Sequence, residues 1–116
     1  VENAYRFNYE LKAVQLGKNK SGELSDSTSF FELSNNNILV SCFKLKETKE
    51  ANNYILRIYN PTPLLQKTDI MFFKKFKKVI KTNLEEIEEK ILVDNSDTKF
   101  SAELGPKKIL TFSIIF

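Results

Sequence analysis

The amino-acid sequence predicts an all-β fold, and more specifically a two-layer antiparallel β-sandwich of about eight short strands. Three observations lead to this prediction: apolar and polar residues alternate in several runs, polar turn segments separate the runs, and β-branched and aromatic residues are common within them. The chain has 116 residues, so we interpret residues 1–116 as a single domain. Its 41% of hydrophobic residues suffice for one modest core.

The N-terminal part of the chain should contain the clearest strand. From Tyr5 to Leu11, apolar side chains recur at every second position, which places them on one face of a pleated strand. Gly17–Ser29 is polar and has no hydrophobic period, so we expect a loop there. A short strand over Phe30–Leu33 then leads into Ser34–Asn37, where asparagines bond the local backbone and tolerate positive φ. We therefore expect a hairpin turn at that point.

The residue pattern in the middle of the chain predicts two strands. Ile38–Lys46 begins with apolar residues on both faces, as expected of a central strand with a layer on each side. Thr48–Asn53 forms a polar turn, and Tyr54–Tyr59 is rich in β-branched and aromatic residues. That strand must end by Asn60, because the prolines that follow cannot donate a hydrogen bond into a sheet.

The remainder of the chain should add four strands. They fall within Gln66–Phe73, Val79–Asn83, Thr98–Leu104 and Ile109–Phe116. In the third of these, Phe100, Ala102 and Leu104 share one apolar face.

Residues 84–91 fit a helix as well as a strand. Leu84, Ile87 and Ile91 have the spacing of one helix face, and charged residues occupy the other positions. A segment this short, without a clear N-cap or a C-terminal glycine, would form only a marginal helix. The sequence leaves both structures open.

The composition excludes several kinds of active site. No histidine is present, which removes Ser-His-Asp and Cys-His nucleophiles and imidazole metal sites. Three glycines are too few for the glycine-rich loops that hold nucleotide phosphates. Cys42 is the only cysteine, so no internal disulfide or cysteine-based zinc cluster can form, and a reducing compartment such as the cytoplasm is favoured. No run of about 18 apolar residues predicts a membrane span, and we expect no membrane partner.

The basic run Lys74-Lys75-Phe76-Lys77-Lys78 could grip phosphates while Phe76 stacks on a base. However, Lys67–Lys81 holds six lysines and one aspartate, a net charge of +5, and Thr82–Asp97 holds six carboxylates and one lysine, a net charge of −5. A nucleic-acid groove normally gathers positive charge without such an acidic neighbour. We therefore favour a solvated turn and expect no nucleic-acid partner.

Two further side-chain groups have simpler structural explanations than a catalytic or binding site. The carboxylates could serve as a glycosidase pair or a calcium site, but exposed charged faces and an Asx turn over Asp94–Asp97 explain them better. They are Glu85, Glu86, Glu88, Glu89, Asp94 and Asp97. The tyrosines could form a sugar-binding platform, although strands that alternate aromatic residues more often line a core. They are Tyr5, Tyr9, Tyr54 and Tyr59.

Arg57 lies in an otherwise apolar strand. It can face solvent on the outer side of the sheet, or it can pair with a carboxylate across an interface through its planar guanidinium. The sequence does not choose between these two placements.

Four segments, taken in order, resemble the C-terminal end of glycoside hydrolase family 38 α-mannosidases. They are Asn37–Glu47, Tyr54–Pro61, Asn83–Glu86 and Leu104–Phe112. The corresponding family segments have the forms "vvls-x-lK-x-x-E", "ilRlyN", "nl-x-E" and "l-x-p-x-ei-x-T". The resemblance covers about three quarters of the chain, from Phe30 onward, and departs from the pattern at Lys107-Lys108, where an acidic residue is usual.

This resemblance implies a non-catalytic C-terminal β-sandwich cut from a larger chain. The parent would be a bacterial enzyme that hydrolyses α-mannosidic bonds, for example in mannosylglycerate, and zinc would be bound by its catalytic domain. The sandwich would pack against the rest of that chain and stabilise it, with no catalytic, cofactor-binding or metal-binding residue of its own. It also implies that Asn83–Glu86 is an extended step into a strand. An autonomous carbohydrate-binding module is the alternative.

Overall fold

The computed structural model describes residues 4, 13–15, 17, 22–23, 25, 27–48 and 50–116. The regular structure of this part consists of eight strands in two antiparallel sheets, which confirms the predicted all-β sandwich. The strands are β1 Phe31–Leu33, β2 Leu39–Leu45, β3 Asn53–Tyr59, β4 Gln66–Phe76, β5 Lys78–Thr82, β6 Glu88–Val93, β7 Asp97–Leu104 and β8 Ile109–Ile115.

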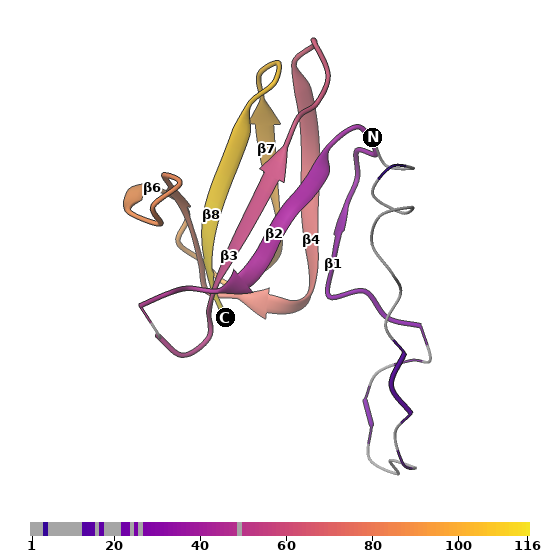
Figure 1. Ribbon diagram of the computed structural model, residues 1–116. Helices are drawn as coiled ribbons and strands as arrows, with labels where there is room; N and C mark the ends of the chain where they lie inside the picture. Colours follow the sequence, from indigo (N-terminus) through magenta and orange to yellow (C-terminus); the bar gives the residue numbers. More distant parts are fainter. Residues whose placement is uncertain are drawn as a thin grey trace.

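The two sheets differ in size and lie face to face (Figure 1). The smaller sheet has the strand order β1-β4-β7, and the larger has the order β2-β3-β8-β5-β6. The last strand, β8, lies in the middle of the larger sheet and pairs with both β3 and β5. The C-terminal segment therefore joins strands from the two halves of the chain.

The core between the sheets is built largely from phenylalanine. Phe100 of β7 packs edge-to-face on Phe112 of β8, with ring centroids 5.2 Å apart, and so links the two layers. Phe72 and Phe76 of β4 contact Phe100 at 6.4 and 5.9 Å. Full burial of a ring of this size contributes roughly 2 to 3 kcal/mol to the free energy of unfolding.

Several strand predictions are confirmed. Strand β3 ends at Tyr59 as expected, and β8 occupies the predicted Ile109–Phe116 apart from its last residue. In β7, Phe100 and Leu104 are buried and Ala102 packs against the same core, which confirms their shared face.

The Lys74–Lys78 run is the bend between two strands rather than a solvated turn. Strand β4 continues to Phe76, and after Lys77 the chain enters β5 of the other sheet. The backbone amide of Lys77 donates to the carbonyl of Ile115 at 2.6 Å, which fixes the bend. The Phe76 ring is completely buried, so it is not available to stack on a base.

Two predictions about neighbouring strands are wrong. Ser34–Asn37 does turn the chain, but it forms no hairpin, because β1 pairs with β4 and β2 pairs with β3. The turn instead carries the chain from one sheet to the other. Strand β2 lies at the edge of its sheet and not in the centre, and Val40 and Leu45 are 40% and 60% exposed.

Residues 84–91 form a turn followed by a strand, and not a helix. Glu86 has a φ of 67°, in the left-handed region, and the chain then enters β6, which pairs with β5. The family resemblance implied an extended segment leading into a strand, and this is closer to the structure than the helix that the residue spacing allowed.

The predicted strand at Tyr5–Leu11 lies outside the described residues. Of the predicted loop over Gly17–Ser29, the residues that are described belong to no strand. Within the described part of the chain, no helix has the length and apolar character needed to cross a membrane.

Candidate functional site

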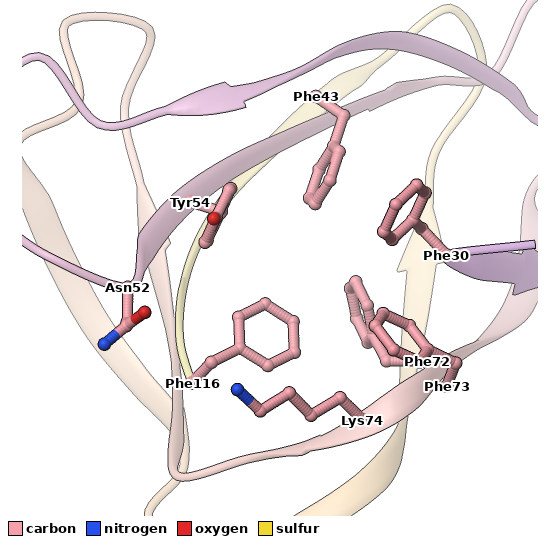
Figure 2. A pocket seen from close by; sticks show the side chains of 8 residues that line it. All are labelled: Phe30, Phe43, Asn52, Tyr54, Phe72, Phe73, Lys74 and Phe116. Atoms are coloured by element: carbon pink, nitrogen blue, oxygen red, sulfur yellow. The ribbon is translucent and has the colours of Figure 1, made fainter. Parts of the chain in front are cut away.

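An aromatic cleft opens at the end of the sandwich where β2 turns into β3. Six aromatic side chains surround a cavity of about 380 Å³, with Asn52 and Lys74 completing its wall (Figure 2). The aromatic residues are Phe30, Phe43, Tyr54, Phe72, Phe73 and Phe116. We refer to these eight residues as the aromatic cleft.

The cleft runs from the core to the surface because β4 contributes two adjacent side chains to it. Neighbouring residues of a strand point to opposite faces. Phe72 is therefore buried at 5% exposure in the core, whereas Phe73 points outward and is 51% exposed. Phe30 is 63% exposed and packs edge-to-face on Phe73 with centroids 5.3 Å apart.

The opposite wall of the cleft is held in place by ring contacts and by the backbone. Phe43 stacks on Tyr54 at 5.5 Å, and Phe116 packs edge-on against Tyr54 at 5.6 Å. The amide of Phe116 donates to the carbonyl of Asn52 at 2.9 Å. These contacts fix both the last residue of the chain and the β2–β3 turn at the cleft.

The basic run borders this cleft, and only part of its charge is neutralised. Lys78 and Lys81 form ion pairs of 3.2 Å with Asp94 and Glu89 of the acidic block, as the cancelling charges suggested. Lys74, Lys75 and Lys77 form no ion pair with any residue in the described ranges, and all are exposed. Of these three lysines, Lys74 lines the aromatic cleft.

A second cluster of polar residues lies on the outer face of the five-stranded sheet. The Glu86 carboxylate accepts a hydrogen bond from the Lys44 ammonium at 2.6 Å and another from the backbone amide of Glu47 at 3.1 Å. The hydrogen bond from Lys44 holds the pKa of Glu86 below its ordinary range, despite the opposing effect of burial. The reciprocal bonds to Glu86 and Glu47 raise the pKa of Lys44.

Arg57 supports the same cluster from β3. Its Nε donates to the Thr111 hydroxyl at 3.2 Å, and its guanidinium also donates to the carbonyl of Leu84 at 3.2 Å. Arg57 therefore lies on the outer face, half-buried beneath the turn between β5 and β6, and holds a carbonyl rather than a carboxylate. Its charge also contributes to the lowered pKa of Glu86.

Asn60 is a buried connector that sequence reasoning identified only as the end of a strand. Its amide nitrogen donates to the carbonyls of Leu64, Leu104 and Gly105 at 2.7, 3.1 and 2.9 Å. Its amide oxygen accepts from the backbone amide of Thr62 at 3.0 Å. One side chain thereby joins the β3–β4 connection to the β7–β8 turn. The Asn-Pro sequence was the available signal, since asparagine before proline favours a turn.

The carboxylates weighed as a glycosidase pair or calcium site do not form one site. Glu86 is buried, contrary to the expectation of an exposed charged face, because it is paired with Lys44. Asp94 pairs with Lys78 instead of closing an Asx turn, and Asp97 accepts from the backbone of the two residues after it. Among the described residues, no group of three or more histidine, cysteine, aspartate or glutamate side chains could hold a metal ion.

The tyrosine platform, the less favoured of the two interpretations, is not formed by the two tyrosines that the structure describes. Tyr54 points toward the aromatic cleft, whereas Tyr59 lies at an odd spacing from it along β3 and therefore faces the other side of the sheet. Tyr5 and Tyr9 lie outside the described residues.

Comparison with known proteins identifies the family. Residues 37–112 match the model described as the glycosyl hydrolases family 38 C-terminal beta sandwich domain, which is more than half of the chain. The matched range includes the clustered Lys44, Arg57 and Glu86, together with Asn60. No curated protein and no solved structure is significantly similar to the chain. On the strength of its two-sheet fold and this match, the chain belongs to the C-terminal β-sandwich domain family of the family 38 glycosyl hydrolases.

Proposed function

We propose that this chain is a non-catalytic domain that packs against the catalytic part of a family 38 glycoside hydrolase and stabilises it. The observation that carries the proposal is the aromatic cleft, where Phe30 and Phe73 are 63% and 51% exposed beside a continuous group of rings. Contiguous apolar surface of this kind marks an interaction site on a soluble domain. The interface between two domains of one chain commonly covers such a surface.

The proposed reaction of the parent enzyme is the hydrolysis of α-mannosidic bonds. The support is the ordered resemblance of four segments to the C-terminal end of family 38 α-mannosidases, strengthened by the family match. The described residues offer no metal-ligand group, so the zinc that the family implies would be held by the catalytic part. The unpaired Cys42 favours a cytoplasmic location, and the acidic block that pairs with Lys78 and Lys81 argues against a nucleic-acid partner.

Truncation of the parent enzyme tests the stabilising role. We expect the enzyme that lacks residues 30–116 to unfold at a lower temperature than the full chain and to expose more apolar surface to a fluorescent dye. Both forms should be assayed with p-nitrophenyl α-mannoside, with the 116-residue chain alone as a control. Unchanged thermal unfolding after truncation, or mannoside hydrolysis by the 116-residue chain, would contradict the proposal.

A further inference from the structure

We propose that the aromatic cleft receives an apolar side chain from an acidic segment of the parent enzyme's catalytic part. This inference rests on the proposed function and adds the chemical character of the partner surface. Two observations carry it: a preformed cavity lined by six aromatic rings, and the exposed Lys74 in its wall, whose charge the described residues leave unneutralised.

The cavity is large enough to admit a large apolar side chain, and its lining suits one. A volume of about 380 Å³ exceeds that of one phenylalanine or leucine side chain, and rings line most of its wall. Figure 2 shows these rings around an open centre, with the Lys74 side chain extending along one edge toward Phe116. An inserted ring could pack edge-to-face on Phe73 or Phe116, as Phe30 and Tyr54 already do.

The cavity is also largely preorganised. Phe43, Tyr54 and Phe116 contact one another in sequence, and Phe72 packs against Phe116 at 5.4 Å. The side chains that line the site are therefore already fixed before a partner side chain enters, and this lowers the entropy cost of association. Phe30 and Phe73 form the exposed side of the cleft and would become buried by the partner.

The charge beside the cavity selects an acidic partner. Lys74, Lys75 and Lys77 are exposed and have no carboxylate partner in the described part of the chain, whereas Lys78 and Lys81 are paired with Asp94 and Glu89. Lys74 lines the apolar site itself, and its uncompensated charge there disfavours a basic segment and attracts an acidic one. Desolvated hydrophobic contacts at the centre and charged contacts at the rim are the usual arrangement of a protein interface.

Other occupants fit the cleft less well. A sugar would need several convergent hydrogen-bonding groups, but the wall offers only the side chains of Asn52, Tyr54 and Lys74 for this purpose. A nucleic-acid groove normally gathers positive charge without an acidic neighbour, whereas here the acidic block pairs with Lys78 and Lys81 of the basic run. A second copy of the chain has an acidic block, but its Glu86, Glu88, Glu89 and Asp94 are already paired with lysines.

Zero-length carbodiimide cross-linking of the full-length enzyme tests this inference. The reagent couples an amine to a carboxylate only when the two groups are in contact. We expect Lys74 to be joined to an aspartate or glutamate outside residues 1–116, in a segment that carries a large apolar residue within a few positions. Lys108, an exposed lysine at the opposite end of the sandwich, is the matched control and should give no such product.

A peptide titration of the 116-residue chain supplies a second measurement. The blocked pentapeptide DEFDE should bind at the cleft and shift the ring resonances of Phe73 and Phe116, whereas DESDE and KKFKK should not. Lys74→Glu should weaken DEFDE binding by roughly tenfold, and Lys108→Glu should leave it unchanged. Added salt should weaken it as well.

The outcomes separate this inference from the proposed function. If truncation destabilises the parent enzyme but Lys74 cross-links to no external carboxylate, the stabilising role holds and the cleft inference is wrong. Equal binding of KKFKK and DEFDE would also overturn it. Self-association of the 116-residue chain that Phe73→Ser abolishes would assign the cleft to a second copy instead.

Discussion

The Glu86 carboxylate lies 2.6 Å from the Lys44 ammonium, and this pair ties the turn after β5 to β2, the strand at the far edge of the same sheet. Arg57 of β3 holds the carbonyl of Leu84 beneath the same turn. The turn therefore crosses the outer face of the five-stranded sheet. In this way, charged residues from separate family segments meet in one cluster whose role is structural.

Replacing Glu86 should reveal a pH-dependent contribution to stability. Because the folded-state pKa of Glu86 is lowered, its contribution is present at neutral pH and is lost as the pH falls through that lowered pKa. We expect Glu86→Gln to reduce the free energy of unfolding by about 1 kcal/mol at pH 7. The difference from the unmodified chain should shrink in acid. Urea denaturation at several pH values measures it, and the exposed Glu85→Gln is the control that should show no such difference.

Replacing Asn60 with aspartate should destabilise the domain strongly. The substitution keeps the shape of the side chain but directs a carboxylate at the three carbonyls that the amide now serves. A buried group that loses its donors and gains a charge costs about 3 kcal/mol or more. Chemical denaturation should show this loss for Asn60→Asp. The exposed Asn36→Asp should stay close to the unmodified chain, and equal effects of the two changes would refute the connector role.

Two neighbouring threonines should respond in opposite ways to valine. Thr82 and Thr111 face each other across β5 and β8 and are 3% and 2% exposed. Among the described residues, the Thr82 hydroxyl has no hydrogen-bond partner, whereas the Thr111 hydroxyl accepts from Arg57. Thr82→Val should therefore raise the free energy of unfolding by about 1 kcal/mol, and Thr111→Val should lower it by a similar amount. Thermal unfolding of both variants measures the difference, and a change of the same sign in both would contradict this assignment.

Two phenylalanines of β4 should differ in their importance for folding. Phe76 is completely buried against Phe72 and Phe100, so Phe76→Ala should cost about 3 to 5 kcal/mol. Phe73 is half-exposed in the cleft, so Phe73→Ala should cost about 1 kcal/mol or less in the isolated chain. If Phe76→Ala does not fold, Phe76→Leu gives the smaller, measurable loss. If Phe73→Ala lowered the free energy of unfolding more than Phe76→Ala does, the assignment of Phe76 to the core would be wrong.

Local sequence patterns predicted the strands better than their partners. The composition of Tyr54–Tyr59 and the prolines after it located the end of β3, and alternation in β7 identified the buried face. The asparagines of Ser34–Asn37 indicated a turn, but a turn signal does not say which sheet receives the next strand. Pairing depends on contacts between residues far apart in the chain, as between β1 and β4.

Residues 84–91, whose pattern fits both a helix and a strand, show how sheet pairing overrides helical spacing. Leu84, Ile87 and Ile91 would share a helix face, but in the structure they are 62%, 58% and 50% exposed. The backbone of Glu88–Val93 pairs with β5 instead, and Glu86 is fixed by Lys44. Neither the pairing nor the ion pair can be derived from the local pattern.

The candidate site was only partly visible in the sequence. The opposite net charges of the lysine run and its acidic neighbour were predicted from the sequence, and two ion pairs form between these segments. The aromatic cleft was missed, because it joins side chains from β2, β3, β4 and the chain end that no local spacing relates.

Hydroxyl-radical footprinting of Phe73 tests the central claim most directly. The oxidation rate of this side chain should be compared in the 116-residue chain and in the full-length parent enzyme, with Leu64 as a reference because it is 66% exposed and lies at the opposite end of the sandwich. The account predicts that Phe73 is strongly protected in the full-length enzyme while Leu64 reacts at a similar rate in both. Equal oxidation of Phe73 in the two proteins would contradict it.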